Sequence, residues 1–407
     1  MKKLLGTTAL VAAAFATAPA MAADKINIKV GGYFVGAIAA VFDSDAGTPL
    51  AAGTDQRTIR FARESEVHFK GSTTLDNGIE IGVKFELETG ESAGFDIVDE
   101  AYIWVSGAFG EFQFGAQDGV GDQMPIVAPS PFLEHFANDT DLDPIGEIYG
   151  QAINTVLDAT GDNEKIIYFT PRLAGFQVGL SYTPEPTEIS GDEVYTDFLS
   201  GDEAFENTFE AGLTWEYAFN GVDLGASFVY LSADGTTAGT LDVEDWALGA
   251  SVGFAGFTIG GAYADKETTG VITGTNIEGS QDWNVGATYG TGPWTFGVEY
   301  AASTVDGATG LPDPVDQQAL LAGLAYSLGG GANVSLGYKY GENKVTNAEG
   351  SALFTEFGVK FYASNHSVLW YGRAFGPALF FCVIASQEKR MPAIPARGSP
   401  AVLAIVV

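Results

Sequence analysis

IEIGVKFELE, residues 79–88, decides the fold of this chain. Apolar side chains occupy every second position from Ile79 to Leu87, and the positions between them are charged or glycine. Successive side chains of a β-strand point to opposite faces, so a two-residue period produces a strand with one wholly apolar face. A helix would scatter the same apolar side chains around its cylinder. This segment is therefore expected to be a strand whose two faces meet different surroundings.

The same alternation recurs along most of the chain. Several segments are apolar in the middle with an aromatic residue at one or both ends, for example Phe209–Tyr217 and Val334–Tyr340. Lipid-facing strands need this pattern, because amphipathic rings prefer the headgroup level. The opposite face is polar, which a water-filled lumen tolerates and a dry core does not. The expected strands span residues 25–42, 57–70, 79–89, 99–106, 111–117, 164–171, 175–184, 207–219, 222–232, 243–254, 257–265, 280–289, 294–302, 316–328, 332–341 and 351–361.

The links between these segments alternate between short turns, such as Asn220-Gly221, and longer polar loops, such as 185–206. Short turns on one side and long loops on the other are typical of outer-membrane barrels. The pattern predicts an all-β protein, a transmembrane antiparallel β-barrel of about 16 strands. Barrels of this width leave an aqueous channel, because side chains cannot fill them.

One link, residues 118–163, is far longer than the others and is rich in acidic residues and proline. Long loops without regular structure are usually functional. We expect this loop, the third external one, to fold into the lumen and narrow the pore. A solvated surface loop is the alternative, because Asp and Pro are common there. The acidic residues expected at the constriction are Asp118, Asp122, Glu134, Asp139, Asp141 and Asp143.

Several basic residues occupy strand positions that the alternation places toward the lumen. They lie on strands near both ends of the chain, and these strands are neighbours where a barrel closes. An acidic loop facing this basic wall would create a strong transverse field in confined water. Arg63 breaks the alternation and needs a bulge, an interfacial position or a contact with another protomer. The alternative is that these charges are solvated rim residues. The wall residues are Lys29, Arg57, Arg60, Lys84, Lys339 and Lys360, with His68 and Lys70 between them.

Composition limits the classes of partner and chemistry. The formal net charge of −33 argues against nucleic acid, whose binding needs basic patches. Cys382 is the single cysteine, so no intrachain disulfide is expected. Residues 1–22 match a secretory signal peptide with cleavage after Ala22. An N-terminal membrane helix is the alternative for this leader.

The sequence gives little support for catalysis. None of the three histidines lies in a nucleophile motif, and there is no His-rich or Cys-rich metal pattern. We therefore expect that this protein is not an enzyme. The group Asp139, Asp141 and Asp143 could bind Ca²⁺ through oxygen ligands, although it lacks the glycine and distal glutamate of an EF-hand loop.

A family resemblance rests on Glu66–Gly71, Thr74–Gly78 and Val83–Glu88, followed by Asp99–Tyr102 and Gly110–Phe112. These stretches resemble the general porins of Gram-negative bacteria, especially the alphaproteobacterial type. The likeness is strongest over 24–120 and continues as a pattern to about residue 361. It implies a homotrimer of sixteen-stranded barrels in the outer membrane lipid, inserted by the barrel-assembly machinery. Each barrel would have its own pore, narrowed by the third external loop.

The end of the chain departs from this family. Phe357, Val359 and Phe361 form the last outward row of the expected barrel at 23–361, but residues 362–407 follow it. This tail carries four basic residues and one acidic residue, with no strand alternation. We interpret the tail as translated out of the ancestral frame. A periplasmic extension and a membrane-associated helix are the alternatives.

Together these observations predict a porin that lets small hydrophilic solutes and ions diffuse passively. A substrate-specific channel, for example for sugars, is the first alternative, and its mark would be a line of aromatic residues along the lumen. Tyr102 and Trp104 have the parity to contribute to one. An outer-membrane hydrolase would need a nucleophile and a base, and a secreted β-sandwich adhesin would need a dry core.

Overall fold

The computed structural model describes residues 25–45, 58–88, 98–133, 137, 153–184, 205–235, 242–267, 270–272, 275–277, 279–306, 315–344 and 347–362. The chain divides into two units, Met1–Pro377 and Ala378–Val407, and all of the described residues belong to the first. The predicted signal peptide with its cleavage site at Ala22 lies outside the described residues. So does the predicted tail, apart from Tyr362.

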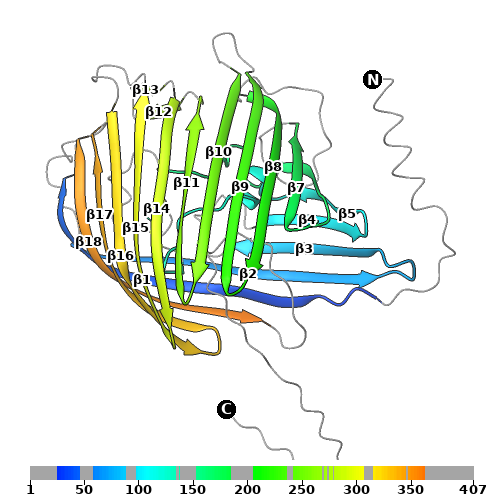
Figure 1. Ribbon diagram of the computed structural model, residues 1–407, viewed down its shortest axis with the longest axis horizontal. Coiled ribbons are helices and arrows are strands. Elements are labelled where there is room, and N and C mark those ends of the chain that lie inside the picture. The colour runs from blue at the N-terminus through cyan, green and yellow to red at the C-terminus, as the bar shows by residue number, and fades with distance from the viewer. Residues whose placement is uncertain are drawn as a thin grey trace, which may run out of the picture. The chain divides into compact units, whose positions relative to one another are not determined.

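The described strands form one closed antiparallel barrel of sixteen strands, as predicted (Figure 1). Each strand pairs with its neighbours in sequence, and β1 closes the barrel by pairing with both β2 and β18. The barrel strands are β1 (Lys29–Asp45), β2 (Ile59–Thr74), β3 (Glu80–Glu88), β4 (Val98–Gly107), β5 (Gly110–Ala116), β6 (Glu164–Phe169), β7 (Phe176–Thr183), β8 (Phe205–Phe219), β9 (Val222–Gly235), β10 (Val243–Phe254), β11 (Phe257–Lys266), β14 (Gly279–Thr291), β15 (Trp294–Asp306), β16 (Val315–Gly329), β17 (Ala332–Asn343) and β18 (Ala348–Tyr362).

Two further strands lie in the link between β11 and β14, where the sequence predicted only a loop. β12 (Gly270–Ile272) and β13 (Thr275–Ile277) pair with each other as a separate two-stranded sheet. Strands of three residues are too short to show a two-residue period, which explains why the pattern missed them. No helix among the described residues has the length and apolar character needed to cross a membrane.

The short turns use residues that tolerate a left-handed backbone. Asn220 and Gly221, between β8 and β9, have φ angles of 50° and 77°. Two successive positive φ angles match the right-handed twist of the flanking strands, which is why Asn-Gly is favoured in such hairpins. The turn thereby fixes the register of β8 and β9, in which Phe219 pairs with Val222.

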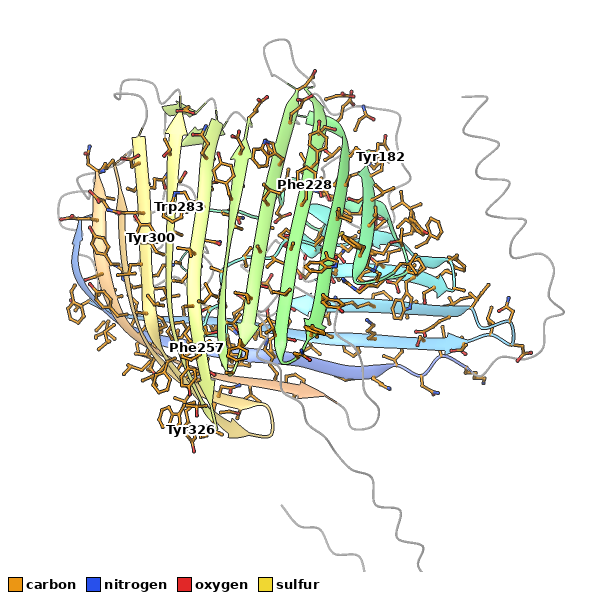
Figure 2. The ribbon with its side chains drawn as sticks, viewed as in Figure 1. Tyr182, Phe228, Phe257, Trp283, Tyr300 and Tyr326 are labelled. Atoms are coloured by element: carbon orange, nitrogen blue, oxygen red, sulfur yellow. The ribbon has the colours of Figure 1, made fainter. Side chains whose placement is uncertain are left out.

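The outward face of the wall is apolar, with rings at both ends of its strands (Figure 2). Phe257 and Tyr326 lie toward one end, and Tyr182, Trp283 and Tyr300 lie toward the other. Aliphatic side chains such as those of Val285, Val298 and Leu336 occupy the band between, and they are exposed. This arrangement is the one a lipid bilayer requires of a barrel surface.

Candidate functional site on the inner wall of the barrel

Side chains of the opposite parity face inward and are mostly polar, small or both. Glutamates, serines and asparagines alternate there with glycine and alanine. The link between β5 and β6 contacts this inward face in its described parts, residues 117–133, 137 and 153–163. Within those described parts, the one regular element is the single helical turn α2 (Val120–Gln123).

Inward-facing acceptors bind the backbone of this link. Glu210 on β8 accepts a hydrogen bond from the N–H of Gly121, at 2.8 Å. Ser227 Oγ on β9 accepts one from the N–H of Ile126, also at 2.8 Å. An extended chain carries N–H groups with no partners of its own, so such acceptors are needed to bury it. Further bonds run from Val120 N to Ser181 Oγ, Ala128 N to Asn284 Oδ1, Leu133 N to Glu356 Oε2 and Ala137 N to Glu299 Oε2.

Glycines on the wall make room for the same stretch. A Cβ atom at Gly249 would lie 1.9 Å from the carbonyl oxygen of Ile126, and one at Gly323 would lie 2.4 Å from Phe132. A side chain at either position would therefore collide with the link. Other inward glycines that approach residues 124–133 are Gly179, Gly212, Gly225, Gly260, Gly286, Gly297, Gly337 and Gly358.

The returning part of the link uses the same anchors. Thr160 Oγ1 donates to Glu210 Oε1 at 3.2 Å, and Thr155 Oγ1 accepts from the Asn284 amide at 2.9 Å. Leu157 N donates to the carbonyl oxygen of Gly121 at 3.2 Å, which joins the two parts of the link directly. Residues 117–133 and 153–163 therefore share one set of contacts on the wall.

Where the link leaves β5 and enters β6, carboxylates gather. One ligand atom from each of Glu100, Asp118 and Asp162 lies within 4.8 Å of the other two. Burial and the negative charges of Asp99 and Glu100 raise the pKa of Asp162 to about 8. Lys165 lies beside this group and donates to the carbonyl oxygens of Gln117 and Gly161. Oxygen-only groups of this kind suit hard cations.

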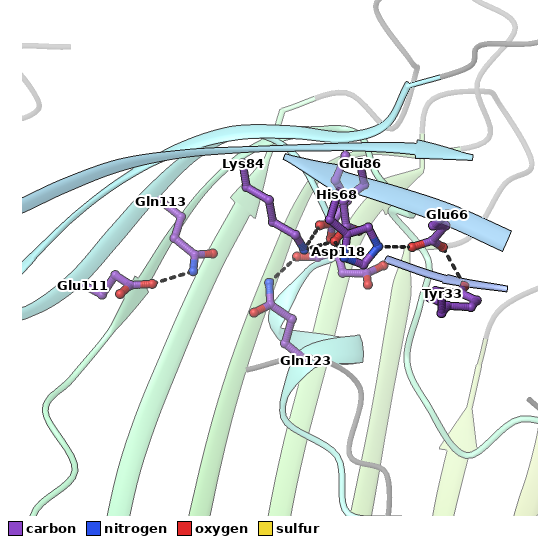
Figure 3. Close-up of polar contacts among 10 residues, drawn as sticks. Tyr33, Glu66, His68, Lys84, Glu86, Glu111, Gln113, Asp118 and Gln123 are labelled. Atoms are coloured by element: carbon purple, nitrogen blue, oxygen red, sulfur yellow. Dashed lines mark hydrogen bonds and ion pairs between the residues drawn. The ribbon is translucent and has the colours of Figure 1, made fainter. Parts of the chain in front are cut away.

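Across strands β2–β4, a row of polar and charged side chains crosses the inner wall (Figure 3). His68 lies between Glu66 and Glu86, with nitrogen–oxygen distances of 2.6 and 3.2 Å. Lys84 Nζ is 2.6 Å from Glu86 Oε1 and also pairs with Glu100 on β4. The side chains follow one another in the order Glu66, His68, Glu86, Lys84 and Glu100, and we call them the charged row.

The predicted site residues are only partly within the described chain. Asp118 lies in the carboxylate group, and Asp122 is buried in α2. The remaining acidic residues, Glu134, Asp139, Asp141 and Asp143, lie outside the described residues, and so does Arg57. The predicted folding of the whole loop into the lumen and the predicted Ca²⁺ site on Asp139, Asp141 and Asp143 therefore stay predictions.

The predicted basic residues are dispersed over the wall. Arg60 has inward parity opposite Ala39, and Lys360 lies 5.8 Å from the ring centre of Tyr33. Lys29 is exposed near the start of β1, whereas Lys339 is completely buried on β17. Of the residues predicted for the basic wall, Lys84 and His68 belong to the charged row. A selective role for the basic wall is untested by this geometry.

Sequence reasoning missed the acidic half of the charged row. Glu86 has the same parity as Lys84, and Glu66 has the same parity as His68, so alternation alone could have placed them inward. Tyr102 and Trp104, the aromatic residues considered for a sugar-binding line along the lumen, do not form a continuous line among the described residues. Trp104 is only 5% exposed, and Lys70 Nζ lies 4.8 Å from the centre of its ring.

Comparisons with known proteins agree with this architecture. A family model described as Gram-negative porin matches residues 7–347. A porin of Rhodobacter capsulatus is 26% identical over 207 residues, which cover 51% of this chain and 62% of that protein. An uncharacterized protein of Rickettsia bellii is 23% identical over 241 residues, covering 49% and 53%. The chain therefore matches somewhat over half the length of these relatives.

Solved structures share the fold at low identity. The trimer form of the outer membrane protein OmpT of Vibrio cholerae has a TM-score of 0.55 at 16% identity, covering 83% of this chain and all of that one. The outer membrane channel DcaP of Acinetobacter baumannii has a TM-score of 0.56 at 14% identity, covering 83% and 97%. A mutant of the Rh. blastica porin has a TM-score of 0.52 at 19% identity, covering 82% and 100%.

Proposed function

Because the chain belongs to the Gram-negative porin family, we propose that it forms a water-filled channel through the outer membrane for passive diffusion of small hydrophilic solutes and ions. The closed barrel of sixteen strands, apolar outside and polar inside, carries this proposal. A barrel of this width is too wide for its own side chains to fill. Export with cleavage after Ala22 and insertion by the barrel-assembly machinery belong to the same proposal.

The link between β5 and β6 would set the width of this channel. Its contacts with Glu210, Ser227 and Asn284 fix its described parts to the wall. The carboxylates of Glu100 and Asp118 would then border the passage where the link begins. A bordering carboxylate attracts cations and repels anions where water is confined.

Cation preference is the selectivity that the described charges favour. Lys84, the lysine of the charged row, is paired with Glu86 and Glu100 on the same wall, so it presents little uncompensated positive charge. Lys266 on β11 is likewise paired with Asp282, at 3.1 Å. The whole chain has a formal net charge of −33, which reinforces the attraction of cations toward the channel.

The outer surface supports a homotrimer. Each barrel strand from β6 to β17 carries an outward Tyr or Trp, whereas the described outward positions of β18 and β1–β5 carry none. Arg63 lies within the second group of strands, exposed and opposite Gly36. An arginine facing lipid near the midplane would cost about 2–4 kcal/mol. We infer that the arc from β18 through β1 to β5 contacts other copies of the chain.

Single-channel recording tests the channel. Purified folded protein in a planar bilayer under a salt gradient should give large current steps in threes, with a cation-selective reversal potential. Small currents blocked by one sugar would instead indicate a substrate-specific channel. Correctly folded protein without any conductance would contradict the proposal.

A further inference from the structure

Three side chains with metal-ligating atoms converge on the inner wall of β2 and β3 (Figure 3). One such atom from each of Glu66, His68 and Glu86 lies within 4.8 Å of the other two. His68 pairs with Glu86 across the two strands, and Glu66 precedes His68 by two positions on the same face. The register of the sheet therefore brings the three groups together.

We propose that Glu66, His68 and Glu86 form a binding site for a divalent transition-metal ion such as Zn²⁺ or Cu²⁺. One imidazole nitrogen with two carboxylates is a donor set that these ions accept, whereas Ca²⁺ and Mg²⁺ prefer oxygen ligands alone. Glu66 Oε2 lies 2.6 Å from His68 Nε2 and Glu86 Oε1 lies 3.2 Å from His68 Nδ1, so the two carboxylates face different nitrogens of the ring. An ion bound at one nitrogen therefore needs the other carboxylate to turn toward it, over the separation of at most 4.8 Å between their ligand atoms. Bonds of about 2.0–2.2 Å in a tetrahedron separate its corners by about 3.3 Å.

Residues around the three ligands hold two of them in place. Tyr33 Oη on β1 donates a hydrogen bond to Glu66 Oε1 at 2.8 Å, which turns Oε2 toward His68. The rings of Tyr33 and His68 meet edge to face, with centroids 6.1 Å apart. Lys84 holds Glu86 through Oε1 at 2.6 Å. Partners of this kind orient ligands and strengthen metal sites.

Charged groups beside the three ligands would act on a bound ion. Lys84 on β3 is a neighbouring positive group, and it pairs with Glu100 on β4 as well as with Glu86. The carboxylate of Glu100 offsets the charge of Lys84, which limits repulsion of the ion. Glu64 adds a further carboxylate near the site, with Oε1 3.4 Å from Tyr33 Oη.

Paramagnetic resonance of bound Cu²⁺ tests the site directly on folded protein in detergent. The spectrum should show superhyperfine coupling to one imidazole nitrogen, and His68→Gln should abolish that coupling. His135→Gln and His366→Gln each remove one of the other two histidines and serve as matched controls that should keep it. Glu86→Gln should weaken Cu²⁺ binding at least about tenfold. Heat-dependent migration on gels and circular dichroism verify that each variant contains a folded barrel.

Two results would overturn the site: a spectrum with oxygen ligands alone, or nitrogen coupling that survives His68→Gln. The effect of Zn²⁺ on current rests on the proposed channel, whereas the spectrum does not. Micromolar Zn²⁺ should shift the reversal potential toward anion permeability in the wild type and leave it unchanged in His68→Gln. Nitrogen coupling in a protein that conducts nothing would uphold the site and refute the channel. Conductance without nitrogen coupling would refute the metal site and uphold the channel.

Discussion

The carboxylate of Glu210 on β8 accepts a hydrogen bond from the backbone N–H of Gly121, at 2.8 Å. The same carboxylate accepts from Thr160 Oγ1 at 3.2 Å and from Ser181 Oγ at 2.6 Å. One buried side chain of the wall thus binds both parts of the link between β5 and β6. This contact explains how the described parts of the link keep a fixed place on the wall.

Glu210→Ala should release the link. The change leaves the N–H of Gly121 and two hydroxyl groups without their acceptor, and hydrogen bonds to a charged group contribute about 1.5–3 kcal/mol each. We expect a lower thermal midpoint of unfolding and larger, noisier single-channel currents. Glu216→Ala is the matched control, because Glu216 has the same parity on β8 and is largely exposed beside Arg172. Equal effects of the two changes would contradict an anchoring role for Glu210.

Gly249→Ala should push the link away from the wall. The added Cβ would lie 1.9 Å from the carbonyl oxygen of Ile126, which is shorter than any real contact. The backbone of the link must then move toward the lumen, so conductance should fall. Gly253→Ala on the same strand meets Asp223 Cβ at 3.4 Å, an ordinary contact, and should conduct like the wild type. Unchanged conductance in Gly249→Ala would show that the link does not limit the current.

Raising the pH through about 8 should increase cation preference. Burial and the charges of Asp99 and Glu100 raise the pKa of Asp162 to about 8, so its carboxyl is largely protonated at neutral pH. Above that pH a further negative charge appears beside Glu100 and Asp118. The reversal potential under a salt gradient should shift toward cations between pH 7 and pH 9, and Asp162→Asn should lose this shift. Asp76→Asn, in the exposed turn between β2 and β3, should retain it.

The same residue makes stability depend on pH. The folded-state pKa of Asp162 is raised above its ordinary value of 3.8, so the folded state retains a proton that the unfolded state releases. Its contribution to the free energy of unfolding is therefore most favourable below about 3.8 and decreases as the pH rises through about 8. Asp162→Asn should remove this part of the pH dependence. Midpoints of unfolding that fall equally with pH in both proteins would contradict it.

Strand identity was predictable because it depends on local pattern. The alternation from Ile79 to Leu87 requires no knowledge of any other part of the chain, and each barrel strand has a similar signature. The charged row was not predictable in the same way. Whether His68 meets Glu86 depends on the register of two strands, and the sequence of neither strand alone contains that register.

The wall residues that contact the link could not be predicted from the sequence, for a related reason. Phe132 approaches Gly323 and Gly337, which are far away in the chain. A glycine in a strand indicates a close approach but does not name the approaching residue. Acidic residues of the link were expected to face a basic wall. Among the described carboxylates, Glu100 pairs with Lys84, and Asp162 lies near Lys165 and other acids.

Spin labels on the outer surface should distinguish lipid from protein contact. Ile38 on β1 lies in the inferred interface, and Val285 on β14 lies between the aromatic rings, and both are exposed in the isolated barrel. In a Cys382→Ser background, a label at Val285→Cys should be relaxed by a lipid-soluble quencher, because acyl chains surround it. A label at Ile38→Cys should be shielded, because a second copy covers it. Arg63→Glu should lower the temperature at which the oligomer dissociates on gels and should expose the Ile38 label. Full access of the quencher to Ile38 in undissociated protein would show that lipid, and not another copy, covers β1.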